Sequence, residues 1–392
     1  MAPQDCDAGC AARSRNVVTE DSPLQSEIKK LIKSAGPMPV WRYMELCLMH
    51  PRHGYYLSRD PLGREGDFTT APEVSQMFGE LLGLWAAWVW RAIGSPPLLR
   101  LIELGPGRGT MMADALRAMR VLPPLYQALS VHLVEINPVL REKQKAALSG
   151  SREIAWHDTI DDVPDGPAII FANEYFDVLP IHQVVKRETG WHERTVEIDS
   201  TGELVFGAAP EPTPHFDVLL PPLVRAAPSG AVFEWRPDAE IMKIASRVRD
   251  QDGAALIIDY GHLRSDAGDT FQAIARHSFA DPLKNPGQAD VTAHVDFQAL
   301  VRAAEDLRAR VHGPVPQGDF LRRLGIETRA LTLMAKASPE VSEDISGALK
   351  RLVTGGRGGM GSMFKVLAIS EPNLISLVGF ADERPDAKAE VP

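Results

Sequence analysis

The residues of this chain whose types and spacing suit chemistry begin with a glycine-rich turn. Gly105, Gly107 and Gly109 form a G-x-G-x-G pattern between the apolar run 101–104 and a helical pattern at 110–119. Glycine allows a sharp backbone turn and lets a ligand approach where a Cβ atom would block it. The amide groups that open the next helix favour an anionic group such as a carboxylate. A tight connection without a ligand is the alternative, but the position between a strand and a helix favours a cofactor site.

Three acidic residues stand beside predicted strands in a pattern that suits a nucleoside cofactor. Glu135 ends the apolar strand 131–134, where a carboxylate accepts hydrogen bonds from the ribose hydroxyls. Glu103 precedes the glycine turn, where an acid can hold the amino-acid end of S-adenosylmethionine. Asp158 follows the third strand, where a methyltransferase contacts the adenine edge, although a solvated acid in the run 158–162 is an equal alternative.

Two cofactors compete for this predicted site, a nicotinamide dinucleotide and S-adenosylmethionine. A dinucleotide fingerprint places its last glycine or alanine at position 110, which is Thr110 in this chain. The ribose-binding acid of a dinucleotide site also usually follows after about 20 residues, and here the gap is longer. The glycine spacing therefore favours S-adenosylmethionine.

A second polar group follows the predicted strand 168–172. Asn173 and Glu174 come directly after this strand, and the aromatic residues Tyr175 and Phe176 follow them. Open α/β sheets place their reactive crevice at the carboxyl ends of the strands. Asparagine also caps helices, but asparagine and glutamate directly after an apolar strand exceed what a cap requires. The sequence thus predicts a second part of the site here.

Alternating short apolar runs and amphipathic helices must position these residues. The predicted strands cover 99–104, 131–135, 154–156, 168–172 and 254–259, and the predicted helices among them cover 110–119 and 138–148. This alternation is typical of βαβ units and a mostly parallel sheet. Before it, helical patterns start at Pro23 and cover 40–48, a loop covers 54–71, and Thr70 with Glu73 resembles a capping box that opens a Trp-rich helix.

The pattern changes to period-2 alternation in the middle of the chain. The runs 182–185, 195–198 and 204–206 predict strands, the last two of them a hairpin around the turn 200–202, and a proline-rich loop follows at 210–222. Polar loops and a second helical layer are expected over 275–350. The glycines of 355–361 predict a flexible hairpin turn into a last strand at 363–369.

Composition and charge exclude several classes of protein. The 392 residues are 44% hydrophobic, so global disorder is excluded, and Lys plus Arg 42 against Asp plus Glu 52 gives a net charge of −10. This balance argues against a nucleic-acid binder. Three cysteines build no disulfide framework, and no segment is long and apolar enough to span a membrane. Acidic residues near the N-terminus weigh against a transit peptide, so a bacterial cytoplasmic location is expected, or the mitochondrial matrix for a eukaryotic chain.

Six stretches together point to one family. They lie at 66–80, 103–110, 173–180, 258–261, 289–297 and 359–361, within about residues 25–370. The two most specific read GDFTTAPEVSQMFGE and NEYFDVLP. With them the chain resembles the MidA-like family of S-adenosylmethionine-dependent methyltransferases, whose mitochondrial members are arginine methyltransferases that assist assembly of respiratory complex I. The resemblance implies an α/β fold, with a Rossmann-like class I methyltransferase sheet and helices on both faces, and S-adenosylmethionine as cofactor. It also implies a protein acceptor, such as an arginine of a complex I subunit.

With that fold, the expected organisation is a disordered tail at 1–22, an N-terminal helical region at 23–95, a methyltransferase core at 96–370 and a C-terminal tail at 371–392. The core carries insertions near 181–230 and 275–350.

An arginine acceptor suggests roles for three residues. A carboxylate can grip a planar guanidinium through paired hydrogen bonds, and Glu174 is the first candidate and Asp177 the second. His294 is a candidate to accept a proton, although a lone histidine is more often structural. Asn173 is assigned to the cofactor together with Glu103, Glu135, Asp158 and the three glycines of the turn.

Two other functions remain open at this stage. A nucleotide-dependent oxidoreductase is disfavoured by the glycine spacing. A non-catalytic assembly chaperone that still binds S-adenosylmethionine retains every cofactor residue, so the sequence does not separate it from an enzyme.

Overall fold

The computed structural model describes residues 21–58, 70–275, 278–356 and 358–380. Residues 1–20 of the expected N-terminal tail and 381–392 of the expected C-terminal tail lie outside the described residues, and so does most of the predicted loop 54–71.

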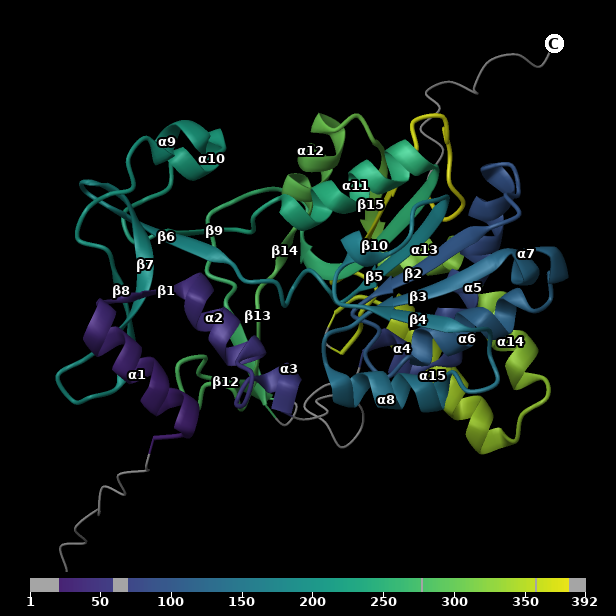
Figure 1. Ribbon diagram of the computed structural model, residues 1–392, viewed down its shortest axis with the longest axis horizontal. Helices are drawn as coiled ribbons and strands as arrows, with labels where there is room; N and C mark the ends of the chain where they lie inside the picture. Colours follow the sequence, from purple (N-terminus) through teal and green to yellow (C-terminus); the bar gives the residue numbers. More distant parts are fainter. Residues whose placement is uncertain (1–20, 59–69, 276–277, 357, 381–392) are drawn as a thin grey trace, which may run out of the picture.

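A large mixed sheet forms the centre of the fold (Figure 1). Its strands lie in the order β4, β3, β2, β5, β10, β16 and β15. The first five are parallel, and β16 is antiparallel to both of its neighbours. Their bounds are β2 Leu99–Leu104, β3 Leu129–Val134, β4 Ile154–His157, β5 Ala168–Asn173, β10 Gly253–His262, β15 Arg310–Pro316 and β16 Phe364–Ser370. The short strand β14 (Val295–Asp296) pairs in parallel with the end of β10. The expected Rossmann-like methyltransferase sheet is confirmed.

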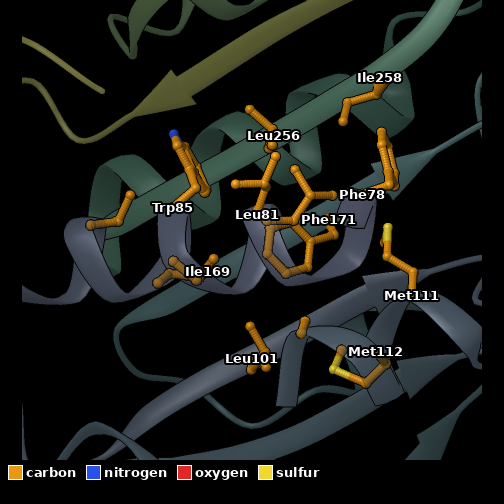
Figure 2. Close-up of a cluster of buried hydrophobic side chains, with 14 of the residues drawn as sticks. Phe78, Leu81, Trp85, Leu101, Met111, Met112, Ile169, Phe171, Leu256 and Ile258 are labelled. Atoms are coloured by element: carbon orange, nitrogen blue, oxygen red, sulfur yellow. The ribbon is translucent and has the colours of Figure 1, made fainter. Parts of the chain in front are cut away.

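Helices cover both faces of this sheet because its strands are apolar on both sides. On β5, Ile169 and Phe171 face one core, whereas Ile170 and Ala172 face the other. The first core includes Trp85 from the Trp-rich helix (Figure 2). The helices that pack there are α5 (Gln76–Ala92), α6 (Thr110–Met119), α13 (Gln317–Arg323), α14 (Ile326–Met334) and α15 (Pro339–Val353). The opposite core lies under α11 (Ala239–Gln251) and α12 (Phe297–Asp306).

Two smaller sheets and the N-terminal helices form a second body beside the large sheet (Figure 1). One sheet has the order β1, β7, β6 and β9, with β8 paired to β7, and the other has the order β12, β11 and β13. The strands are β1 Met38–Pro39, β6 His182–Arg187, β7 Gly190–Ile198, β8 Leu204–Ala208, β9 Val232–Trp235, β11 Gln272–Ala275, β12 Ser278–Ala280 and β13 Asp290–Thr292. Strands β1, β7, β8, β11 and β13 share a core with α1 (Pro23–Ala35) and α2 (Val40–Met49), whereas β6 and β9 contribute to a separate small core. The hairpin predicted around 200–202 is confirmed, since β7 and β8 pair antiparallel.

Three local predictions are wrong. Thr70 caps no helix with its side chain: α4 (Ala71–Val74) is a single turn, and Ser75 caps the long helix α5 by accepting from Met77 N at 3.2 Å. Glu73 instead accepts a hydrogen bond from the hydroxyl of Thr110 at 2.6 Å, because tertiary contact outweighs the local cap. The last strand predicted at 363–369 is confirmed as β16, but the described glycines of 355–361 lie in the connection between α15 and β16 rather than in a hairpin, since β16 pairs with β10 and β15.

Short helices interrupt regions that were predicted as loop or left unassigned. They are α3 (Tyr55–Ser58), α7 (Pro123–Ala128), α9 (Phe216–Leu219), α10 (Pro222–Arg225) and the 3₁₀ helix η1 (Ile160–Asp162). Proline at the first turn favours α7 and α10, as it does the longer α8 (Pro138–Ala147). Of the helices in the described part of the chain, none is long and apolar enough to cross a bilayer.

Candidate active site

A cavity of about 650 Å³ lies at the carboxyl ends of the parallel strands. It lies beside the point where the strand order reverses, between β2 and β5, which is where open α/β sheets bind their ligands. Residues at or just after the carboxyl ends of β2, β3, β5 and β10 contribute to its wall, and so do α3, the small sheet β12-β11-β13 and the loop after α15. The fold thus brings together polar residues from distant parts of the chain.

The glycine turn forms one end of the cavity. Gly105 and Gly107 line it with positive φ angles of 61° and 53°, a region that non-glycine residues rarely adopt. A Cβ atom on Gly105 would lie 3.1 Å from the ring of Tyr175. Gly109 does not line the cavity: it precedes α6 at φ 82° and packs against the backbone of Gln144. Two of the three glycines therefore line the cavity, and the third packs against α8.

Glu135 follows β3 and faces the same end of the cavity. Its carboxylate accepts from Asn137 N at 2.8 Å and from the side chain of Gln144 at 3.3 Å. Gln144 also donates to the carbonyl of Gly107 at 2.7 Å, so its side-chain amide contacts both the glycine turn and Glu135. The sequence contains no signal for either residue, since Asn137 looks like an ordinary N-cap before the predicted helix 138–148 and Gln144 like an ordinary residue within it. Asp158 lines the cavity edge, with a 74% exposed side chain paired to Arg141 at 2.6 Å.

Two buried polar atoms at this end have no hydrogen-bond partner among the residues that the structure describes. They are Oε2 of Glu103 and Oδ1 of Asn173. Burial, with Glu135 nearby, raises the pKa of Glu103 to about 8. Unsatisfied buried polar atoms are rare and indicate a missing partner. A cationic ammonium beside Glu103 and ribose hydroxyls beside Glu135 would satisfy this end, so the residues present fit a nucleoside that carries an amino acid.

Glu174 lines the cavity next to that end. Its backbone has φ 50°, an uncommon value for a residue with a side chain, and its amide donates to Ile258 O at 2.9 Å. Its carboxylate accepts from Asn173 at 3.2 Å and from Ala71 N at 3.4 Å. Burial and the neighbouring Asp177 raise the pKa of Glu174 to about 7. The pairing of strands β5 and β10 therefore holds this carboxylate in place.

Asp177 brings a second carboxylate into the cavity. It is 4% exposed, and its Oδ1 has no hydrogen-bond partner within the described part of the chain. Burial raises its pKa, although the hydroxyl of Tyr260 opposes that rise. Asp259 fixes the backbone here by accepting from Phe176 N at 3.0 Å and from Asp177 N at 3.2 Å. Asp177 thus carries a free acceptor atom on a backbone that buried groups hold rigid.

His294 lines the same region. Its backbone amide donates to the hydroxyl of Thr270 at 2.9 Å, and its ring meets the ring of Tyr260 edge-on at 5.6 Å. Burial, followed by the nearby His262, Arg236 and Lys365, lowers the pKa of His294. The imidazole is therefore neutral at pH 7 and able to accept a proton.

Three further residues that line the cavity were not predicted from the sequence: Tyr56, Tyr260 and Asp290. The hydroxyl of Tyr56 donates to Asp290 at 3.0 Å, and all three residues line the cavity. The side chain of Asn137 donates to the carbonyl of Tyr56, which links this wall to the loop after β3. Tyr260 and Asp290 stand within the stretches 258–261 and 289–297 quoted for the family resemblance, so a signal for them existed. Tyr56 lay in a segment predicted as loop.

Comparisons with known proteins agree with this geometry. The model of the family described as S-adenosyl-L-methionine-dependent methyltransferases matches residues 81–315. A Drosophila melanogaster protein named protein arginine methyltransferase NDUFAF7 homolog, mitochondrial, is 36% identical over 374 residues, which cover 88% of this chain and 84% of the relative. The human protein arginine methyltransferase NDUFAF7 is 36% identical over 376 residues, covering 89% and 83%.

A solved structure gives the same result for the fold and the ligand. A Burkholderia thailandensis protein crystallised with S-adenosyl-homocysteine superposes with a TM-score of 0.77 at 28% identity, covering 91% of this chain and 93% of that one.

Proposed function

Since the chain belongs to the family of S-adenosyl-L-methionine-dependent methyltransferases, we propose that its acceptor is an arginine side chain of a protein partner. Two relatives at 36% identity are named protein arginine methyltransferases. A subunit of respiratory complex I is the partner that the family resemblance suggests. A bacterial cytoplasmic location stays a prediction.

One observation carries the arginine proposal: two buried carboxylates, Glu174 and Asp177, stand three residues apart at the cavity wall, and one of their oxygens has no partner within the described residues. A guanidinium is planar, permanently charged and offers five N–H donors. Glu174 and Asp177 would bind it through charge-assisted hydrogen bonds. Asp290 adds a third acid to the same cavity. A neutral acceptor would leave Oδ1 of Asp177 without a charged donor.

The cofactor end is proposed to be held by the residues named from the sequence. Glu103 would bind the ammonium group, Glu135 the ribose and Asp158 the adenine edge, while Gly105 and Gly107 let the backbone approach. Asn173 would contact the cofactor from the strand end, and Gly109 supports the turn through its packing on Gln144. When bound, S-adenosylmethionine supplies an electrophilic methyl group on a sulfonium.

The chain's own residues would then align the acceptor rather than provide strong acid–base catalysis. Glu174 and Asp177 orient the guanidinium so that one nitrogen faces the cofactor end, a positioning effect worth up to several kcal/mol. That nitrogen loses a proton once it is methylated. Glu174, or the neutral imidazole of His294, would accept it.

The acceptor proposal is tested with a pool of 11-residue peptides that carry one central arginine, and with matched pools that carry lysine or citrulline at that position. Formation of S-adenosyl-homocysteine is measured at saturating cofactor. Turnover of the arginine pool alone supports the proposal. Turnover of lysine but not arginine would overturn it. If the protein binds the cofactor but turns over no pool and no candidate partner, it acts as a cofactor-binding chaperone.

A proton-release experiment tests the cofactor end separately. Glu103 carries a proton at pH 7, because its pKa in the free protein is about 8. An ammonium group beside it favours the charged carboxylate, so we expect cofactor binding at pH 7 to release close to one proton. Calorimetric titrations in buffers of different ionisation enthalpy measure that number.

The substitution Glu103→Gln should abolish the proton release and weaken binding. The matched Glu135→Gln should weaken binding and reduce the release without abolishing it, because burial remains the larger cause of the raised pKa of Glu103. A titration without proton release would remove Glu103 from the ammonium site.

A further inference from the structure

The small sheet β12-β11-β13 forms one wall of the acid-lined cavity. Gln272 and Ile274 of β11, Phe279 of β12 and Asp290 of β13 all line it. Residues two apart on a strand share a face, so Ala273 points the other way and is buried in the core of the N-terminal helices. The sheet therefore separates that core from the cavity.

A cross-strand row on this wall runs from a buried acid to the surface. Ile274 pairs with Asp290 on one side and with Phe279 on the other. Asp290 is 4% exposed, whereas Phe279 is 80% exposed. The row thus has the large aromatic side chain of Phe279 at its solvent end and the buried carboxyl group of Asp290 at its inner end.

Strand β12 is an edge strand. It pairs with β11 on one side, and no further strand in the described part of the chain pairs with it. All three of its residues are exposed. An edge strand offers unpaired N–H and C=O groups, and extended peptides bind such edges by adding a strand, with alternate side chains entering pockets.

We propose that the arginine-bearing segment of the protein substrate binds in an extended conformation along the free edge of β12, with its arginine entering the cavity past Phe279. The inference rests on the proposed arginine acceptor. An added strand lies about 4.8 Å from its neighbour, so a side chain on its inner face lies one strand spacing from a residue that lines the cavity. The acids Glu174, Asp177 and Asp290 supply the charge complementarity for a cationic side chain.

Strand addition makes a prediction that no side-chain docking mode shares. Successive amides of an added strand point alternately toward β12 and away from it. Starting from the best acceptor of the randomised arginine pool, single N-methyl groups are placed at successive backbone nitrogens on both sides of the arginine. Each lost hydrogen bond should raise KM about fivefold to tenfold, at every second position only, and the positions between should leave KM unchanged.

The minimal acceptor Nα-acetyl-arginine N-methylamide separates failure of this inference from failure of the proposed function. It should be methylated with a KM at least tenfold above that of the peptide. Methylation of both probes without alternation in the N-methyl series would overturn strand addition and leave the arginine acceptor standing. Methylation of neither probe would overturn both.

A substitution in the protein, rather than in the peptide, tests the same surface. The substitution Phe279→Ala should reduce the preference for the peptide over the minimal acceptor by about tenfold. The matched control is Val121→Ala, which removes an exposed apolar side chain (77% exposed) between α6 and α7, and it should keep the preference. An unchanged preference in Phe279→Ala would contradict the proposal.

Discussion

The substitution Glu174→Gln is expected to lower kcat/KM for an arginine acceptor by about 30-fold to several thousandfold. Removing the charge from one partner of a buried, hydrogen-bonded ion pair costs about 2–5 kcal/mol, and 1.4 kcal/mol corresponds to a factor of ten. Glutamine has nearly the same shape as glutamate, so the decrease in kcat/KM measures the contribution of the negative charge. Binding of the cofactor should change little, because glutamine keeps the oxygen that accepts from Ala71 N and from the side chain of Asn173.

The pH dependence gives this prediction a second readout. The pKa of Glu174 is about 7 in the free protein, and only the carboxylate form binds a guanidinium. As pH falls below 7, kcat/KM should therefore fall about tenfold per unit, and above 7 it should level off. Because Asp177 is close, the apparent pKa belongs to the pair.

Saturating cofactor removes the contribution of Glu103 from this profile. In Glu174→Gln the slope between pH 5.5 and 7 should flatten. A wild-type profile that is flat across this window, or a variant that keeps the wild-type slope, would assign the acceptor contact to another residue.

Local sequence patterns predicted the elements of the large sheet closely. The strand 99–104 and the helix 110–119 match β2 and α6 at both ends, because strong apolar periodicity and a glycine turn act over a few residues. The polar residues at the ends of the strands were also predicted from local patterns. Parallel strands bring their carboxyl ends to one edge, so Glu135, Asn173 and Glu174 meet at one cavity.

The parts that the sequence did not predict depend on contacts between distant segments. Glu73 looks like a capping residue, but the hydroxyl of Thr110 donates a hydrogen bond to its carboxylate. Asp290 looks like one acid of a polar loop, and only the fold places it against Tyr56, 234 residues away. Gly109 fits the glycine pattern but contacts Gln144 rather than the cavity. Propensity and spacing contain no information about such pairings.

Arg236 is the strongest example of such a contact. It lies between β9 and α11, and its guanidinium donates to the carbonyls of Leu179 at 3.1 Å, Asp177 at 2.9 Å, His294 at 2.8 Å and Ala293 at 2.7 Å. These carbonyls belong to the segment after β5 and the segment after β13. Burial lowers the pKa of Arg236, and Asp177 and Asp259 oppose this. One buried cation therefore joins the two segments that carry Asp177 and His294.

The substitution Arg236→Met should lower the free energy of unfolding by about 3–5 kcal/mol, because it removes the guanidinium that donates to four carbonyls and leaves two buried acids without that cation. Unfolding in urea, followed by tryptophan fluorescence, measures this change. The control Arg302→Met removes an exposed arginine 3.6 Å from Asp238 and should cost less than about 1 kcal/mol.

Arg236→Lys keeps the charge but has fewer donors in a different geometry, so it should fold and show a raised KM for the acceptor at unchanged cofactor affinity. If Arg236→Met costs no more than Arg302→Met, the carbonyl contacts are not what holds the two segments together. If Arg236→Lys leaves the acceptor KM unchanged, Arg236 stabilises the fold without positioning the acceptor site.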